Sequence, residues 1–214
     1  MTAAPTPLKP RSTAAGFIYL ASQSPRRSQL LDQLGVPHRL LLPQADENAE
    51  QLELVRPGEP PSRYVQRVTL LKLDAAVSRL ARLGLPLAPV LCADTTVALG
   101  SRILGKPVDA TDAQYMLQTL SGRTHRVLTA VAVQSGPQRM HRLSISRVRF
   151  AQLTPLWIDA YVRSGEPMGK AGAYAIQGRA AAMIERISGS YSGIMGLPLH
   201  ETEQILHALT LLRH

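Results

Sequence analysis

Cysteines, aromatic residues and long apolar runs are all scarce in this chain of 214 residues. Its one cysteine, Cys92, cannot form a disulfide or a cysteine-based zinc site within the chain, which favours a reducing compartment, the cytoplasm. No apolar run reaches the roughly 18 residues of a membrane-spanning helix, so we expect no membrane partner. Aromatic residues make up only 4% of the chain, so the core must consist of leucine, valine, isoleucine and alanine.

Several catalytic motifs are also missing. No Walker-type glycine loop occurs, which argues against a P-loop nucleotide-binding domain. His200 and Glu201 begin a zinc-protease pattern, but Gln204 stands where its second histidine belongs. Residues 190–193 lack the spacing of a nucleophile elbow, and the histidines show no metal-ligand clustering. The sequence therefore gives no support for those enzyme classes.

Positive charge exceeds negative charge, with 24 Lys and Arg against 15 Asp and Glu and a formal net charge of +9. This balance suggests an anionic partner, such as nucleic acid, an acidic membrane or a phosphorylated small molecule. A basic surface without any partner explains the charge equally simply. Residues 1–16 contain Lys9 and Arg11 but no apolar segment, so we expect a disordered tail and not a secretory signal.

Apolar periodicity and turn residues predict strands that alternate with helices. Helices are expected to begin at Ser24, Ser62, Thr111, Thr154 and Leu199. Strands are expected at residues 17–21, 40–42, 90–99, 103–104, 125–133, 141–150, 173–177 and 181–187. Gly100 and Ser101 form a two-residue hairpin turn in this scheme. The order predicts an α/β fold with a mixed sheet flanked by helices, in a single domain over residues 17–214.

The first candidate site lies where a strand ends and a helix begins, at Ser22, Ser24, Arg26 and Arg27. A helix N-terminus presents free N–H groups and the positive end of the helix dipole, which suits a phosphate group. Two arginines in the first turn oppose that dipole, and a bound anion would relieve the conflict. The alternative is an ordinary helix cap with two solvated arginines.

The second candidate site centres on Asp94, which precedes Thr95 in an apolar strand. A carboxylate in such a strand needs a partner, a metal ion or a catalytic task. Strict hairpin pairing sets Thr95 opposite Lys106, so a bulge would bring Lys106 to Asp94; a purely structural Asp–Lys pair is the alternative. Glu47, in the loop after the second strand, would hold a divalent cation together with Asp94, or is simply an exposed loop acid.

A glycine-rich loop over residues 166–178 forms the third candidate site. Glycines allow a ligand to approach the backbone closely. Lys170 offers a point charge for a phosphate, and Gln177 offers a donor and an acceptor suited to the edge of a nucleobase.

Together these segments resemble the Maf family. The matching stretches are LASQSPRR at residues 20–27, ADTTV at 93–97, GKP at 105–107, LSGRTH at 120–125, KAGAYAIQG at 170–178, GSY at 189–191 and GLP at 196–198. The resemblance implies a Maf/inosine-triphosphatase-like fold with two lobes around a central cleft, and a homodimer. It also implies hydrolysis of a nucleoside triphosphate to the monophosphate and pyrophosphate, with a divalent metal cation, Mg²⁺ or Mn²⁺.

The resemblance assigns roles to individual residues. Asp94 becomes the proton acceptor, with Lys106 and Glu47 as further catalytic residues and with Asp94 and Glu47 as metal ligands. The expected substrate-binding residues are Ser22, Ser24, Arg26, Arg27, Thr95, Lys170 and Gln177. One departure is Gly169, which stands where the family usually has an aspartate before the lysine.

Three of these positions point to a pyrimidine substrate. Members that act on dTTP and UTP resemble this chain at Arg26, Thr95 and Gln177, whereas members that act on 7-methyl-GTP carry an aromatic residue, Gln and Glu there. The sequence therefore predicts dTTP and UTP, or modified pyrimidine nucleotides, as substrates.

Two functions without turnover fit parts of the sequence. The net charge suggests a nucleic-acid-binding protein, although the scarcity of aromatic residues argues against base stacking, and we expect no specific nucleic-acid partner. A nucleotide-sensing regulator of cell division is the other alternative.

Overall fold

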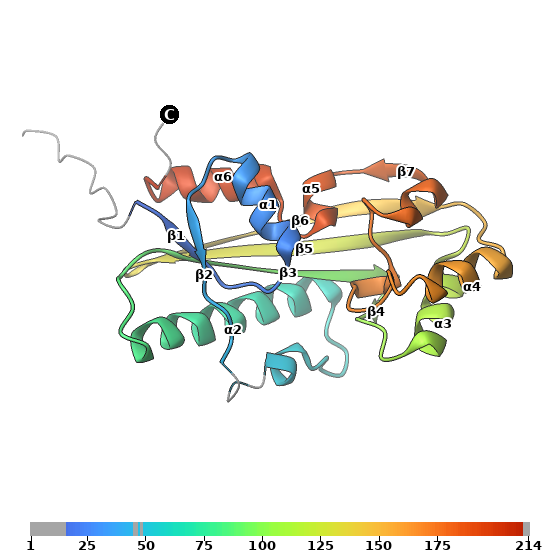
Figure 1. Ribbon diagram of the computed structural model, residues 1–214, viewed down its shortest axis with the longest axis horizontal. Coiled ribbons are helices and arrows are strands. Elements are labelled where there is room, and N and C mark those ends of the chain that lie inside the picture. Colours follow the sequence, from blue (N-terminus) through green and yellow to red (C-terminus); the bar gives the residue numbers. More distant parts are fainter. Residues whose placement is uncertain (1–15, 45–46, 48, 212–214) are drawn as a thin grey trace, which may run out of the picture.

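A computed structural model describes residues 16–44, 47 and 49–211. The tail predicted at residues 1–16 lies outside this range except for Gly16, as does Asp46 beside Glu47. In the described chain one mixed sheet is flanked by helices (Figure 1), which confirms the predicted α/β class. No helix in this part of the chain combines the length and the hydropathy that crossing a membrane requires.

The sheet has seven strands in the order β2-β1-β3-β5-β6-β7, with β4 paired to the far end of β3. Parallel pairs join β1 to β2 and to β3, and the other pairs are antiparallel. The strands are β1 (Ile18–Leu20), β2 (His38–Leu40), β3 (Val90–Leu99), β4 (Arg102–Leu104), β5 (Thr124–Ser135), β6 (Gln138–Phe150) and β7 (Ile184–Ser188). One edge of β3 is paired with β1 at its start and with β4 at its end, so its middle is left open between them.

Helices cover both faces of this sheet (Figure 1). Helix α2 (Pro61–Arg82) lies on one face, where Val68 packs with Leu128 of β5. Helices α1 (Pro25–Gln33) and α6 (Leu199–Ala208) lie on the other face, where Leu31 and Ile205 pack with Val131. The remaining helical segments are α3 (Ala110–Leu120), α4 (Pro155–Arg163), α5 (Tyr191–Met195), and the 3₁₀ segments η1 (Ala49–Glu53), η2 (Ala171–Ala173) and η3 (Arg179–Met183).

The core is divided along the length of the strands. One cluster joins α3 and α4 to the far ends of β3 and β5, and includes Val97, Leu117 and Ile158. The other clusters lie under α1, α2 and α6. Apolar residues at helical and strand spacing therefore build two lobes on one continuous sheet, with the open stretch of β3 between them.

Two helix starts, those of α1 and α4, follow the predicted capping signals, whereas Pro60 precedes α2 and Asp109 caps α3. Ser24 is the N-cap of α1 with Pro25 behind it, and the Thr154 side chain caps α4 by accepting a hydrogen bond from the Trp157 N–H at 3.2 Å. Helix α2 begins at Pro61 and not at the predicted Ser62, because proline is tolerated in a first turn, where the N–H has no intrahelical partner. Strand β2 lies two residues earlier than predicted.

The strand predicted at residues 173–177 is wrong. Gly172 and Ala173 have positive φ angles of 67° and 58°, which a strand does not accommodate. The segment forms the 3₁₀ turn η2 and then a second turn through Ile176 and Gln177. Its apolar residues are buried against the α3–α4 cluster, so their pattern reflected packing and not strand pairing.

Candidate active site

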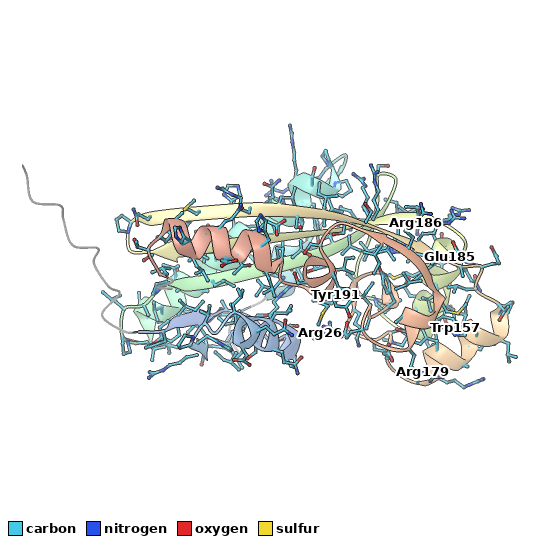
Figure 2. The ribbon with its side chains drawn as sticks, turned by 90° about the horizontal axis from the view of Figure 1, so that it is seen from above. Arg26, Trp157, Arg179, Glu185, Arg186 and Tyr191 are labelled. Carbon is cyan, nitrogen blue, oxygen red and sulfur yellow. The ribbon has the colours of Figure 1, made fainter. Side chains whose placement is uncertain are left out.

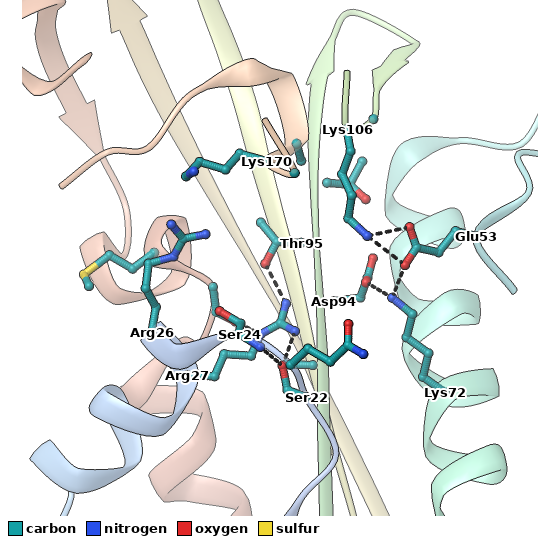
Figure 3. Close-up of a pocket in the computed structure, with 18 of the residues that line it drawn as sticks. Ser22, Ser24, Arg26, Arg27, Glu53, Lys72, Asp94, Thr95, Lys106 and Lys170 are labelled. Carbon is teal, nitrogen blue, oxygen red and sulfur yellow. Dashed lines mark hydrogen bonds and ion pairs between the residues drawn. The ribbon is translucent and has the colours of Figure 1, made fainter. Parts of the chain in front are cut away.

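A pocket of about 800 Å³ opens at the free stretch of β3. Its walls come from the start of α1, the buried side of α2, the end of β4 and the loop around η2. All ten residues that the sequence singled out line this pocket: Ser22, Ser24, Arg26, Arg27, Glu47, Asp94, Thr95, Lys106, Lys170 and Gln177. Segments that are far apart in the sequence therefore meet at one site (Figure 3).

One side of the pocket holds two carboxylates and two lysines. The Asp94 carboxylate lies 2.5 Å from Nζ of Lys72, and the Glu53 carboxylate lies 2.7 Å from the same nitrogen. Glu53 also accepts from Nζ of Lys106, at 3.1 Å. Lys72 thus joins the two acids, and Glu53 joins the two lysines (Figure 3).

The expected contact between Asp94 and Lys106 is not formed. The β3–β4 ladder ends at the pair Val97 and Leu104, so the chain leaves the sheet before Lys106. Lys106 reaches Glu53 instead, and Lys72 of α2 takes the place beside Asp94.

The charged groups in this cluster determine whether Lys72 and Glu53 are ionised. Burial by itself would lower the pKa of the Lys72 ammonium, but the carboxylates of Asp94 and Glu53 outweigh burial and raise it. Burial would raise the pKa of Glu53, but the two lysines outweigh that effect and lower it. Lys72 and Glu53 are therefore both charged at neutral pH.

Glu47 lies on the same side but faces two arginines. Its Oε1 accepts hydrogen bonds from Arg79 and Arg82, both at 2.8 Å, and its Oε2 forms an ion pair with Arg79. The hydrogen bond from Arg79 lowers the pKa of Glu47 to about 2. Both carboxylate oxygens of Glu47 are therefore already paired with guanidinium groups.

Arg27 fixes the floor of the pocket. Its guanidinium donates to the Gly196 carbonyl at 2.7 Å, to Oγ of Ser22 at 3.0 Å and to Oγ1 of Thr95 at 3.4 Å. Thr129 donates to Thr95 from the neighbouring strand β5 at 3.0 Å. These contacts join the start of α1 to β3 and to the residue that ends α5.

Arg26 and Lys170 form a cationic side opposite the carboxylates (Figure 3). The Arg26 Nε is buried without a hydrogen-bond partner, and burial together with Arg27 lowers the pKa of the Arg26 guanidinium. Lys170 donates only to backbone carbonyls, those of Glu166 and Met168, and burial followed by Arg26 lowers its pKa. Within the described chain neither group has an ion pair with a carboxylate, so an anion between them would relieve their repulsion.

The loop that carries Lys170 and Gln177 is fixed by backbone contacts. The N–H of Gly172 donates to the carbonyl of Gly105 at 2.9 Å, which ties this loop to the chain that follows β4. Gly169, where the resemblance led us to expect aspartate, has a positive φ of 71°, and the carboxylate of Glu166 partly opposes the lowering of the Lys170 pKa. Gln177 lines the pocket and is exposed.

Sequence reasoning missed Lys72, Glu53 and Arg79. Lys72 and Arg79 lie seven residues apart on the face of α2 that is otherwise buried and apolar. Two cations at helical spacing on a core-facing stripe are unusual, and this was the signal that the sequence offered. Glu53 lies in the 3₁₀ turn η1 and carried no such signal.

The pocket therefore has complementary halves. Carboxylates paired with lysines line one side, and two cations without carboxylate partners line the other, which suits a ligand that carries several phosphate groups. In the described residues no three His, Cys, Asp or Glu side chains gather as a ready-made metal site.

Comparison with known proteins gives consistent matches. A family model described as Maf-like protein matches residues 17–209. A protein of Polaromonas sp. named dTTP/UTP pyrophosphatase is 65% identical over 91% of this chain and 96% of its own length. Proteins of the same name from Albidiferax ferrireducens and Cupriavidus metallidurans are 65% and 64% identical, over 90% and 89% of this chain and 96% and 95% of their own lengths. A crystal structure of a nucleoside-triphosphatase (dITP/XTP pyrophosphatase) from Mycobacterium abscessus aligns at 14% identity and a TM-score of 0.39, over 64% of this chain and 75% of that one.

Proposed function

Because this chain belongs to the Maf family, we propose that it is a nucleoside triphosphate pyrophosphatase that hydrolyses dTTP and UTP to the monophosphate and pyrophosphate. The observation that carries this proposal is the pair of Arg26 and Lys170, cations without carboxylate partners that face the carboxylate of Asp94 across one pocket. Modified pyrimidine nucleotides that present the same base edge belong to the same substrate class.

The phosphate chain of the substrate binds between Arg26 and Lys170. Its negative charge replaces the missing counter-ion of both groups, and the start of α1 after Ser24 adds the positive end of a helix dipole. Arg27 holds Ser22 and Thr95 in position beneath the substrate. Positioning and charge neutralisation supply most of the rate enhancement in reactions of this kind.

Asp94 acts as the general base. This residue is 8% exposed at the open stretch of β3, and its carboxylate accepts the proton of a water molecule that attacks the α phosphorus. The bond between the α phosphorus and the bridging oxygen to the β phosphorus breaks, and pyrophosphate leaves. The ion pairs of Lys72 with Asp94 and of Lys106 with Glu53 hold the two carboxylates in position for this step.

A divalent cation, Mg²⁺ or Mn²⁺, fits the carboxylates of Asp94 and Glu53. Both carboxylates converge on the Lys72 ammonium, which supplies the positive charge between them, so a divalent cation would take this place when the ammonium moves aside. The cation would neutralise charge that develops on the phosphate oxygens. The sequence suggested Glu47 for this task, but its two guanidinium partners favour Glu53 as the second ligand and leave Glu47 to shape the pocket wall with Arg79.

Base selection involves Gln177, Arg26 and Thr95. Gln177 offers a donor and an acceptor at the rim, a combination that matches the edge of uracil or thymine. Thr95 is held by hydrogen bonds from Arg27 and Thr129, so its position at the floor of the pocket is fixed.

The same resemblance leads us to propose a cytoplasmic enzyme that forms a homodimer. Light scattering on the purified protein measures the dimer directly. The single cysteine is buried, and burial raises the pKa of the Cys92 thiol to about 11, so it is an unreactive core residue.

Pyrophosphate release from a panel of nucleoside triphosphates tests the function. We expect release from dTTP and UTP with Mg²⁺ or Mn²⁺, and we expect Asp94→Asn to reduce turnover by about 10²–10⁴-fold while the protein stays folded. Release only from a guanine nucleotide would contradict the substrate class. Binding without release, in folded protein, would instead support a nucleotide-sensing regulator.

A further inference from the structure

Four arginines share one open face of the sheet, away from the pocket. They are Arg126 of β5, Arg147 and Arg149 of β6, and Arg186 of β7. We call this group the arginine face. It lies on the same side of the sheet as α2, which packs mainly on β3 and β5. Helix α2 also reaches β6 at Arg139 and near Leu143, on the part of the strand that precedes Arg147 and Arg149. Arg147, Arg149 and Arg186 are exposed, and together with Thr124, Ser188 and the acidic Glu185 they line a hollow of about 500 Å³.

The sequence around this face is depleted of acidic residues. Residues 113–158 contain six arginines and neither aspartate nor glutamate. Two of the six have partners elsewhere, since Arg139 pairs with Asp74 of α2 and Arg142 donates to the carbonyl of His141. Positive charge in this segment therefore gathers on the arginine face.

The strand register places like charges directly opposite one another. Arg126 pairs with Arg147 across β5 and β6, and Arg149 pairs with Arg186 across β6 and β7. Directly opposed side chains lie about 5 Å apart at Cβ, and like charges in that position destabilise a sheet. Opposite charges would be the stabilising choice at both positions.

One carboxylate partly offsets this repulsion. Glu185 lies next to an irregularity in the β6–β7 ladder, and its carboxylate accepts from Nε of Arg149 at 3.1 Å. Arg126 donates to the neutral carbonyl of Gly100. In the described chain Arg147 and Arg186 have no side-chain hydrogen bond or ion pair, so the face keeps a net positive charge that a bound anion would neutralise.

The spacing of the arginines on this face indicates a ligand with regularly repeated negative charges. Arg147 and Arg149 are two residues apart on a rigid strand, about 7 Å along its axis, with further cations on the strands at either side. A ladder of charges suits a polyanion better than a single small ion. No aromatic side chain lies in the hollow to stack on a base, so contact is with the backbone and independent of sequence.

We propose that the arginine face binds the phosphate backbone of nucleic acid, at a site separate from the catalytic pocket. Figure 2 shows Arg186 and Glu185 well apart from Arg26, and the hollow shares no lining residue with the pocket. The enzyme would thus be held weakly, and in a salt-dependent manner, near the polymers whose synthesis consumes its substrates.

Binding of a labelled DNA duplex, followed by fluorescence anisotropy over a range of salt concentrations, tests this proposal. The test variant is the double substitution Arg147→Glu with Arg186→Glu. The matched control is Arg142→Glu with Arg163→Glu, which makes the same change in net charge at exposed positions, one of them on the opposite face of the same strand. Pyrophosphate release is measured on every variant as a readout of the intact pocket.

We expect the wild type to bind the duplex with an affinity that falls steeply as the salt concentration rises. The test variant should bind more than about tenfold more weakly than the wild type, whereas the affinity of the control should stay within about threefold of it. Nucleotide hydrolysis should be unchanged in both. Equal losses in the test and control variants, or no binding at low salt, would overturn the proposal. So would displacement of the duplex by inorganic pyrophosphate at an equal phosphate concentration, which indicates a small-anion site. Binding to vesicles rich in phosphatidylglycerol but not to DNA would point to a membrane surface instead.

Discussion

Two carboxylates on the segment between β2 and α2, of which the sequence singled out only Glu47, have different partners in the fold. Glu53 is joined to Lys72 and Lys106, which both reach the pocket, whereas Glu47 is joined to Arg79 and Arg82. A lysine ammonium is a compact charge that moves easily, but a forked guanidinium that fills both oxygens of a carboxylate is harder to displace. This difference favours Glu53 over Glu47 in the proposed metal site.

A comparison of Glu53→Gln with Glu47→Gln tests this difference. Glu53→Gln should lower kcat by about 10²-fold or more and raise the metal concentration needed for half-maximal rate, because a ligand is lost. Glu47→Gln should lower kcat by less than about tenfold, but it should destabilise the fold because Arg79 is left partly unpaired. Kinetics over a range of Mn²⁺ concentrations, together with thermal unfolding, separate these outcomes. The reverse order of the two effects would assign the metal to Glu47.

Gln177→Glu is the sharpest test of base recognition. The change replaces an amide that donates and accepts with a carboxylate that only accepts, so one contact to a pyrimidine edge is lost. We expect kcat/KM for dTTP and UTP to fall by about 10–10²-fold, with little change in unfolding temperature because the residue is exposed. An unchanged preference over the nucleotide panel would remove Gln177 from the base site.

At the scale of elements, the loop around η2 depends on one glycine. Gly172 has a φ of 67°, and a Cβ at this position would lie 2.8 Å from the Val97 side chain of β3. The loop can approach β3 closely only because this atom is absent. That close approach sets the positions of Lys170 and Gln177 at the pocket.

Gly172→Ala should therefore disturb both stability and binding. Left-handed backbone costs about 1–2 kcal/mol for alanine, and the overlap with Val97 adds about 1–3 kcal/mol. Gly136→Ala is the control, since Gly136 has a similar φ of 55° but open space around it. Chemical denaturation should show the larger loss for Gly172→Ala, and only this variant should raise KM. Equal losses of stability in the two variants would mean that the Val97 side chain moves aside at no cost in free energy.

At the scale of the whole molecule, a buried histidine links stability to pH. His125 is 2% exposed in the α3–α4 core, where it contacts the hydroxyl of Tyr174 at 2.8 Å and packs edge-on against Phe150. Burial lowers the pKa of the His125 imidazole from 6.5 to about 4, so the ring is neutral in the folded protein.

This shift predicts a loss of stability in mild acid. Between pH 6.5 and about 4 the unfolded chain binds a proton at His125 that the folded chain does not, so stability falls as the pH falls through this window. The loss at its lower end is on the order of 3 kcal/mol. His125→Gln should be less stable at neutral pH but should show a shallower decline toward pH 4, measured by urea unfolding at each pH. An identical slope in both proteins would place the proton uptake elsewhere.

The amino-acid sequence by itself determined the elements and the composition of the pocket. Three kinds of signal are local and do not depend on distant contacts: the capping residues Ser24 and Thr154, the apolar run of β3 and the Gly100–Ser101 turn. The motif residues also proved to line one cavity, because Asp94 and Thr95 lie on the open stretch of β3 and the others lie in loops or first turns that face it.

Only the tertiary structure decided the partners of the charges. The contact of Lys72 with Asp94 and that of Arg79 with Glu47 each join α2 to a segment distant in sequence, and no local pattern encodes such a pairing. The loop at residues 173–177 was misjudged for a related reason, since buried apolar residues look alike whether they pair in a sheet or pack beneath one. Local propensity is read from neighbours along the chain, but ion pairs and packing depend on distances that exist only after folding.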